Sequence, residues 1–107
     1  MTPDKFVEYA SFVTMPPWAI SVKRNIEGVD GLPIPVEDQT VQIVIKRFIG
    51  DGDKQQEIRR RRTIEPILIN DAVMFNDRLS VVKFVQEFVK ESQALIDSGE
   101  VECAHRA

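Results

Sequence analysis

Cysteine and histidine are almost missing from this sequence. Cys103 is the only cysteine, so no internal disulfide is possible, and small secreted domains usually carry several. His105 is the only histidine, and together with Cys103 it offers a nucleophile–base pair or half of a metal site. Both arrangements need a rigid frame and further ligands, whereas residues 100–107 are predicted to be a flexible polar tail. We therefore expect no catalytic residue, no metal site and no cofactor.

Long apolar runs and an excess of basic charge are missing as well. No stretch of about 18 apolar residues occurs, and the first twenty residues hold Asp4, Lys5 and Glu8 instead of the apolar segment of a leader peptide. We expect a cytoplasmic protein with no membrane partner. The net charge is −3, from 14 basic and 17 acidic residues, whereas proteins that coat nucleic acid usually carry a basic excess. This balance argues against such a role for the whole surface, but not against a local basic patch.

The acidic residues form no recognisable site in the sequence. Asp51 and Asp53 flank a glycine, and turn chemistry alone explains them. Asp30, Glu37 and Asp38 lack the spacing of a calcium loop. Neither a glycine-rich phosphate loop nor a nucleophile elbow occurs. The sequence therefore predicts a protein that is not an enzyme.

What the chain does contain is the composition of an ordinary globular domain. Its 107 residues are 43% hydrophobic and 29% charged, which excludes disorder of the whole chain. A chain of this length can bury a core without disulfides, so residues 1–107 are predicted to form one domain.

Two helices and a strand are predicted from periodicity and capping. Residues 2–13 have one apolar face at helical spacing, and Thr2 and Pro3 suit the cap and the first turn. Residues 18–24 alternate between large apolar and small or polar side chains, as in a half-buried strand. Residues 78–97 form the best amphipathic helix, with its apolar residues in a single arc.

Two segments are less regular. Residues 25–39 hold glycines, prolines and acidic residues, and they are predicted to be a long loop. Residues 66–76 are ambiguous, since they fit one short strand, two strands, or a lead-in to the last helix. The sequence alone does not choose among these three.

Residues 40–64 are predicted to form a β-hairpin. Asp51-Gly52 is a strong signal for a two-residue turn of type I′, which needs positive φ at both positions. Placing these two residues at the tip sets a register in which apolar faces apolar and opposite charges meet. The pairs are Ile45 with Ile58, and Lys46 with Glu57.

The second strand of this hairpin contains four consecutive arginines, Arg59–Arg62. Strand alternation places Arg60 and Arg62 on the face of the buried Ile58 and Ile64, where guanidinium groups are unfavourable unless they are paired. Three arrangements resolve this conflict. A bulge re-aims the run, or the strand lies at an edge with its arginines reaching past the core, or acidic groups of the long loop or of a second subunit pair with them.

These elements predict an α+β fold. We expect an antiparallel sheet of three to four strands with two helices on one face, in the order α-β-β-β-(β)-α. The other face of the sheet is expected to meet water or a partner, because about half of the strand residues are polar.

For function, the sequence favours a small non-enzymatic interaction module. It is expected to bind a protein partner, or itself as a homodimer, through the hairpin and the 25–39 loop. The candidate partner-binding residues are Lys46, Arg59, Arg60, Arg61 and Arg62. The first alternative is nucleic-acid binding by the same basic hairpin. The second is a small-molecule pocket near Trp18 and Tyr9.

Overall fold

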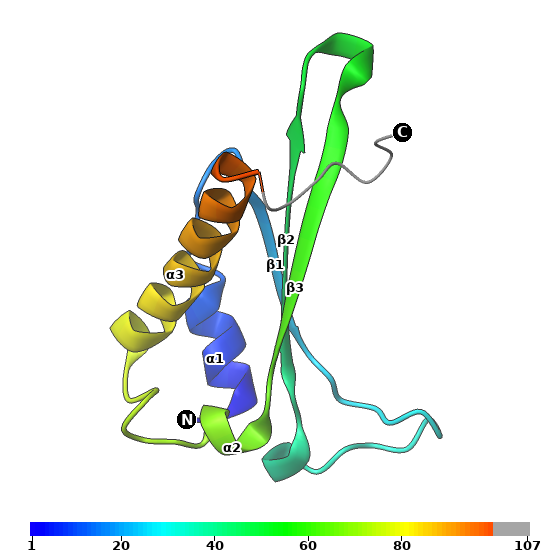
Figure 1. Ribbon diagram of the computed structural model, residues 1–107. Coiled ribbons are helices and arrows are strands. Elements are labelled where there is room, and N and C mark those ends of the chain that lie inside the picture. The colour runs from blue at the N-terminus through cyan, green and yellow to red at the C-terminus, as the bar shows by residue number, and fades with distance from the viewer. Residues whose placement is uncertain (100–107) are drawn as a thin grey trace.

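The computed structural model describes residues 1–99 and has a three-stranded antiparallel sheet at its centre (Figure 1). The strands are β1 (Ala19–Arg24), β2 (Val41–Ile49) and β3 (Gln56–Ile64), and they lie side by side in chain order. Both outer strands are edges. The predicted α+β class is confirmed, with three strands in the sheet.

The face of the sheet that is buried follows the alternation in the sequence. Val41, Ile43 and Ile45 on β2 are completely buried, and their partners on β1 include Ile20 and Val22. Strand alternation sends the intervening residues to the opposite face. One face of the sheet is therefore apolar at its centre and the other is polar.

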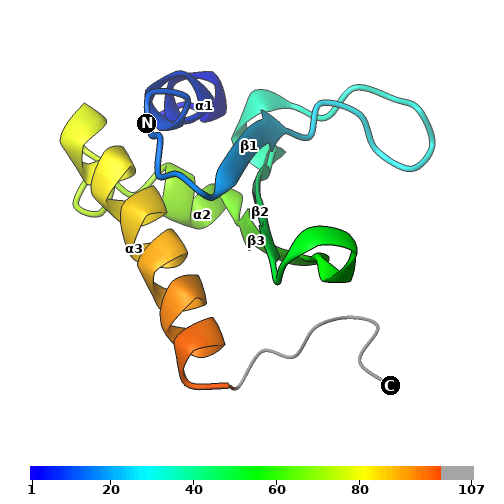
Figure 2. The ribbon, with the colours of Figure 1, turned by 90° about the horizontal axis from the view of Figure 1, so that it is seen from above.

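Two helices cover the apolar face, as the sequence predicts (Figure 2). They are α1 (Pro3–Ala10) and α3 (Arg78–Asp97). Phe6 from α1 and Val81 and Val85 from α3 are fully buried in the same core as the β2 residues. At the N-terminus of α3, Asp77 Oδ1 accepts a hydrogen bond from the Ser80 backbone N–H and closes a capping box.

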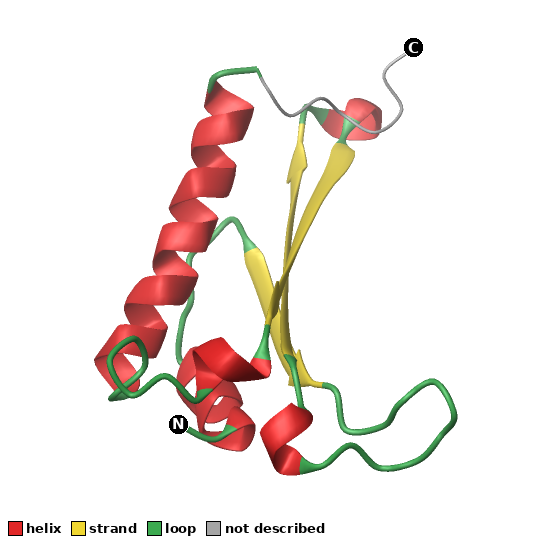
Figure 3. Cartoon of the chain, turned by 60° about the horizontal axis from the view of Figure 1, so that its bottom comes forward, coloured by secondary structure: helices red, strands yellow, loops and turns green. Residues whose placement is uncertain are grey.

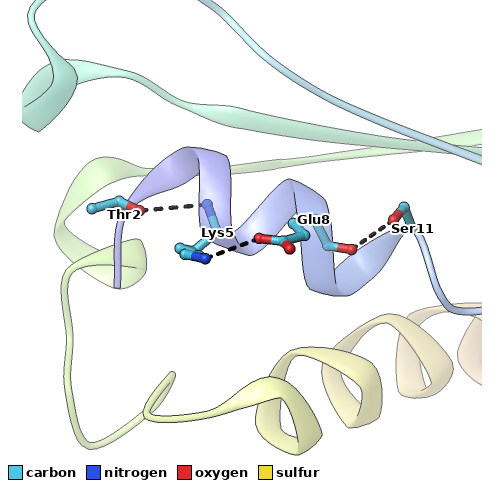
Figure 4. Close-up of polar contacts among 4 residues, drawn as sticks. All are labelled: Thr2, Lys5, Glu8 and Ser11. Carbon is cyan, nitrogen blue, oxygen red and sulfur yellow. Dashed lines mark hydrogen bonds and ion pairs between the residues drawn. The ribbon is translucent and has the colours of Figure 1, made fainter.

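Helix α1 is shorter than the predicted 2–13 segment, and its polar side is held by local contacts (Figure 4). The Lys5 backbone N–H donates a hydrogen bond to Thr2 Oγ1 at 3.4 Å, which confirms Thr2 as the N-cap of the helix. The Lys5 side chain pairs with Glu8 at 3.2 Å, which raises the pKa of Lys5. A hydrogen bond from the Thr2 side chain lowers the pKa of Asp4, an acidic residue in the first turn, where a negative charge suits the helix dipole.

The β2–β3 hairpin exists, but its predicted register is wrong by two residues. Ile49 pairs with Gln56, so the connection spans residues 50–55 and includes the short 3₁₀ helix Gly52–Lys54. Asp51 has φ −119°, which excludes the type I′ turn expected there. The observed partners are Ile45 with Arg60, Lys46 with Arg59, Arg47 with Ile58, and Phe48 with Glu57. Because the shift is an even number, every side chain keeps its predicted face.

Gly50 is the residue that this longer turn requires. Its φ is +99°, and a Cβ there would lie 2.7 Å from the Lys54 carbonyl oxygen. We expect Gly50→Ala to lower the free energy of unfolding by about 3 kcal/mol, through backbone strain and this clash. Gly52→Ala is the matched control, because Gly52 has φ +54° and open space around it; it should cost about 1 kcal/mol. Equal midpoints in urea unfolding for the two variants would contradict this assignment.

The ambiguous 66–76 segment adds no strand to the sheet. It begins with the short helix α2 (Pro66–Ile69) and continues as a loop into α3. Ile69 and Phe75 are buried, whereas Val73 is 91% exposed. Pro66 favours the helical start because the first turn needs no backbone N–H there.

The segment between β1 and β2 is a long loop, as predicted, and it projects from the sheet (Figure 3). A backbone bridge between Glu27 and Pro33 and a 3₁₀ helix at Val36–Asp38 give it some order. The predicted flexible tail, with Cys103 and His105, lies outside the described residues.

Candidate functional site

The four arginines of β3 divide between the two faces of the sheet. The ladder with β2 runs without interruption from the Val41–Ile64 pair to the Ile49–Gln56 pair, so no bulge re-aims them. Arg60 and Arg62 point to the helix side, and Arg59 and Arg61 to the opposite side. The strand lies at an edge of the sheet, as one of the three predicted arrangements has it, and Arg60 and Arg62 pair with no acidic group of residues 1–99.

The two helix-side arginines pack against α3. Arg60 Nη1 donates to Ser92 Oγ at 2.8 Å, and its guanidinium carbon lies 5.3 Å from the centre of the Phe88 ring. The guanidinium carbon of Arg62 lies 4.7 Å from the centre of the Phe84 ring. Cation–π contacts of this kind contribute about 0.5–2 kcal/mol each. Both residues therefore have contacts within the chain that attach α3 to the sheet.

The opposite side of the sheet carries the other two arginines and is not covered by any helix of residues 1–99. We call it the open face and define it by Lys23, Lys46, Arg59, Arg61 and Phe48, which are all exposed. Lys23 comes from β1, Lys46 and Phe48 from β2, and the arginines from β3. All three strands thus contribute a basic side chain to one surface.

Two of these cations face each other directly. Lys46 is the cross-strand partner of Arg59, and side chains in such positions have Cβ atoms about 4.5–5.5 Å apart. Like charges at this distance lower stability. Glu57 partly relieves the repulsion, because its carboxylate lies 2.9 Å from Arg59. Among the described residues, Lys46, Lys23 and Arg61 form no ion pair.

A shallow groove runs across this face and holds the basic groups together. Its volume is about 350 Å³. Lys23, Lys46, Arg59 and Arg61 line it, with Ser21, Gln42 and Val44 between them. The groove is therefore positively charged, and Ala19, Ile20 and Val44 form the apolar part of its lining.

Phe48 adds an aromatic ring to this basic surface. It is 54% exposed and lies two residues beyond Lys46 on the same face of β2. A half-exposed aromatic side chain beside cations can stack on a flat ligand while the cations bind its charge.

Sequence analysis places Lys46, Arg59 and Arg61 correctly on one face but misses Lys23. The alternation within residues 18–24 already sends Lys23 away from the apolar side. Only the pairing of β1 with β2 brings it beside the groove, however, and the sequence does not show which strands are neighbours. Lys54, another basic residue of the hairpin, lies in the 3₁₀ helix at its tip and is not part of the open face.

A second surface gathers exposed apolar side chains on the 25–39 loop. Val29 and Leu32 are 112% and 63% exposed, and Ile26 and Val36 are about half exposed. Isolated exposed apolar residues are common, but four within one projecting loop form a surface of their own.

Residues 1–99 offer neither a metal site nor a membrane-spanning helix. No three His, Cys, Asp or Glu side chains in this range are grouped closely enough to hold a metal ion. None of its helices combines the length and the apolar character needed to cross a bilayer. Comparisons with family models, curated proteins and solved structures give no match for this chain.

Proposed function

We propose that the chain binds single-stranded nucleic acid across the open face of its sheet. The observation that carries this proposal is the like-charged pair Lys46–Arg59 on an uncovered sheet face, extended by Arg61 and Lys23. Such a pairing costs the free protein stability, and a bound polyanion would offset that cost. Phosphate contacts of this type supply most of the sequence-independent affinity for nucleic acid. A cytoplasmic location, expected from the scarcity of cysteine, is part of the proposal.

Phe48 favours a single strand over a duplex. Stacking of an unpaired base on an aromatic ring contributes about 1–3 kcal/mol and tolerates any base. In a duplex the faces of the bases are already stacked and only their edges are accessible in the grooves. A surface that offers one ring face beside several cations therefore suits an unpaired strand better.

The distribution of charge also favours the open face as the surface that binds nucleic acid. The open face carries four basic residues and one acidic residue, Glu57. Residues 1–99 contain 13 basic and 15 acidic residues, so nine basic and fourteen acidic residues lie elsewhere in this described part of the chain. The acidic remainder repels a polyanion, so that the open face is the preferred side of approach.

Fluorescence anisotropy with labelled random-sequence DNA and RNA tests the proposal, using single strands and matching duplexes. Up to four phosphate contacts give a salt slope of about −2.8, so affinity for single strands should fall ~50-fold between about 50 and 200 mM salt. Tighter binding of duplexes than of single strands would contradict the stacking role of Phe48. No binding to any of the probes at the lower salt would overturn the proposal as a whole.

The second candidate is a protein interaction module, which the exposed apolar side chains of the 25–39 loop favour. The loop would bind a protein partner or a second copy of the chain. The arginines give this candidate less support than the sequence suggests, because Arg60 and Arg62 have contacts within the chain. Failure to bind nucleic acid, combined with a solution mass above the 12.2 kDa of one chain, would favour it over the first.

A further inference from the structure

A second cleft lies on the helix-covered side of the sheet, away from the open face. Its volume is about 320 Å³, at the small end of the range of ~300–1,000 Å³ for small-molecule sites. Its apolar walls are formed by Met15, Pro16, Pro17, Trp18 and Val89, and the polar residues of its lining are Arg47, Lys90 and Gln93. Apolar walls with a few polar groups are the usual composition of a site for a small organic ligand.

Arg47 is the residue that gives this cleft its chemistry. Its Nη1 donates to Gln93 Oε1 at 2.6 Å, and its guanidinium carbon lies 5.9 Å from the centre of the Trp18 ring. Its Nε is buried and has no hydrogen-bond partner within the described residues. No carboxylate of residues 1–99 forms an ion pair with it. A guanidinium with five N–H donors is thus held in a largely apolar setting with its charge uncompensated.

Gln93 positions this guanidinium without neutralising it. Its Oε1 accepts from both Arg47 Nη1 and Trp18 Nε1, the second at 3.0 Å, and its Nε2 donates to Asp97 Oδ1 at 3.0 Å. These three bonds fix the orientation of the amide. The Gln93 amide also lies between Arg47 and Asp97, so that the nearby acid is engaged by the amide and not by the arginine.

We propose that this cleft binds an organic monocarboxylate with an apolar body, held by Arg47. The planar fork of a guanidinium matches a carboxylate with two parallel hydrogen bonds. The apolar walls accommodate a hydrocarbon or aromatic group attached to it. A phosphate monoester fits less well, because it carries up to two charges and more acceptors than Arg47 can satisfy, and Lys90, the other cation of the lining, already pairs with Glu87 at 3.8 Å.

This chemistry has two possible sources, a free organic acid or the C-terminal carboxylate of a peptide that ends in an apolar residue. Both place one carboxylate beside an apolar group, and the probes must separate them. Octanoate and phenylacetate represent the free acids. A short peptide ending in leucine, prepared as the free acid, represents the chain terminus.

Trp18 supplies a specific readout, because it is the only tryptophan in the chain and it lines the cleft. Titration with each acid should give a saturable change in tryptophan fluorescence. The matching neutral amides, octanamide, phenylacetamide and the amidated peptide, should bind at least ~10-fold more weakly, because charge-assisted pairing with Arg47 is lost. A response to octanoate or phenylacetate identifies free acids, and a response to the peptide acid alone identifies a chain terminus; either supports the site.

Arg47→Gln tests the arginine directly and should abolish the preference for acid over amide. Arg61→Gln removes the same charge from the open face and should leave that preference intact. Circular dichroism checks that both variants are folded; if Arg47→Gln is not, Arg47→Lys keeps the charge and should weaken acid binding severalfold by losing the bidentate geometry. The proposal is overturned if no acid gives a saturable change, or if acids and amides give equal affinities in the wild-type protein.

Discussion

Replacing Phe75 by alanine should lower the free energy of unfolding by about 3–5 kcal/mol, the usual range for a buried phenylalanine. Phe75 is 1% exposed although it belongs to the loop between α2 and α3. Its ring packs edge-to-face against the rings of Phe6 and Phe84, with distances between ring centres of 5.0 Å and 5.2 Å respectively. The loss would be a large part of the ~5–15 kcal/mol that stabilises a typical domain.

Urea unfolding followed by far-ultraviolet circular dichroism measures this effect. Val73→Ala is the matched control, because Val73 lies in the same loop and is 91% exposed. It should change the free energy of unfolding by no more than about 0.5 kcal/mol. A Phe75→Ala variant within about 1 kcal/mol of the wild type would mean that this loop is not anchored as described.

Charge reversal on the open face should have the largest effect on binding. The double variant Arg59→Glu, Arg61→Glu should weaken single-stranded nucleic acid binding ~100-fold or more at low salt, since two cations are lost and two anions are added. The salt slope should become shallower by about 1.4, which is two contacts at ~0.7 each. Salt-dependent anisotropy titrations measure both quantities.

Stability should change little in this double variant, because both arginines are exposed. Arg59→Glu loses the ion pair with Glu57 but places opposite charges at the cross-strand position facing Lys46, so these two effects offset each other. The matched control is Lys83→Glu, Lys90→Glu, which makes the same change in net charge on the exposed side of α3. Equal weakening by both double variants would show that net charge matters and the open face does not.

Much of the fold can be predicted from the sequence, because the deciding signals are local. The helix at 78–97 follows from its apolar arc and its cap, and its observed bounds agree with the prediction. The assignment of Arg60 and Arg62 to the helix side follows from alternation alone. It is unaffected by the error in register, because an even shift changes partners without changing faces.

Two features depend on information that the sequence does not display locally. The turn at residues 50–55 looks like a two-residue turn because Asp51-Gly52 is a strong local signal, but the positive φ angles fall at Gly50 and Gly52. The buried position of Phe75 depends on rings from α1 and α3 that are distant in sequence. Pattern alone therefore does not determine the structure of residues 66–76.

The candidate sites likewise combine features that local patterns predict with features that depend on contacts between distant residues. Alternation predicts that Lys46, Arg59 and Arg61 share a face. The addition of Lys23 requires the strand order, which pattern does not supply. The cleft includes Trp18, one of the two residues near which the sequence suggests a pocket, but not Tyr9. Its decisive group, Arg47, could not be foreseen, because Gln93 is 46 residues away in the chain.

The cations between α3 and the sheet bear on how the protein responds to acid. Arg47, Arg60 and Arg62 contact aromatic rings, an amide and a hydroxyl, and none of them pairs with a carboxylate of residues 1–99. Acid unfolding is driven mostly by protonation of carboxylates that are paired in the native state. None of these three contacts is such a pair: the one carboxylate in this network, Asp97, accepts a hydrogen bond from the neutral Gln93 amide and not from an arginine.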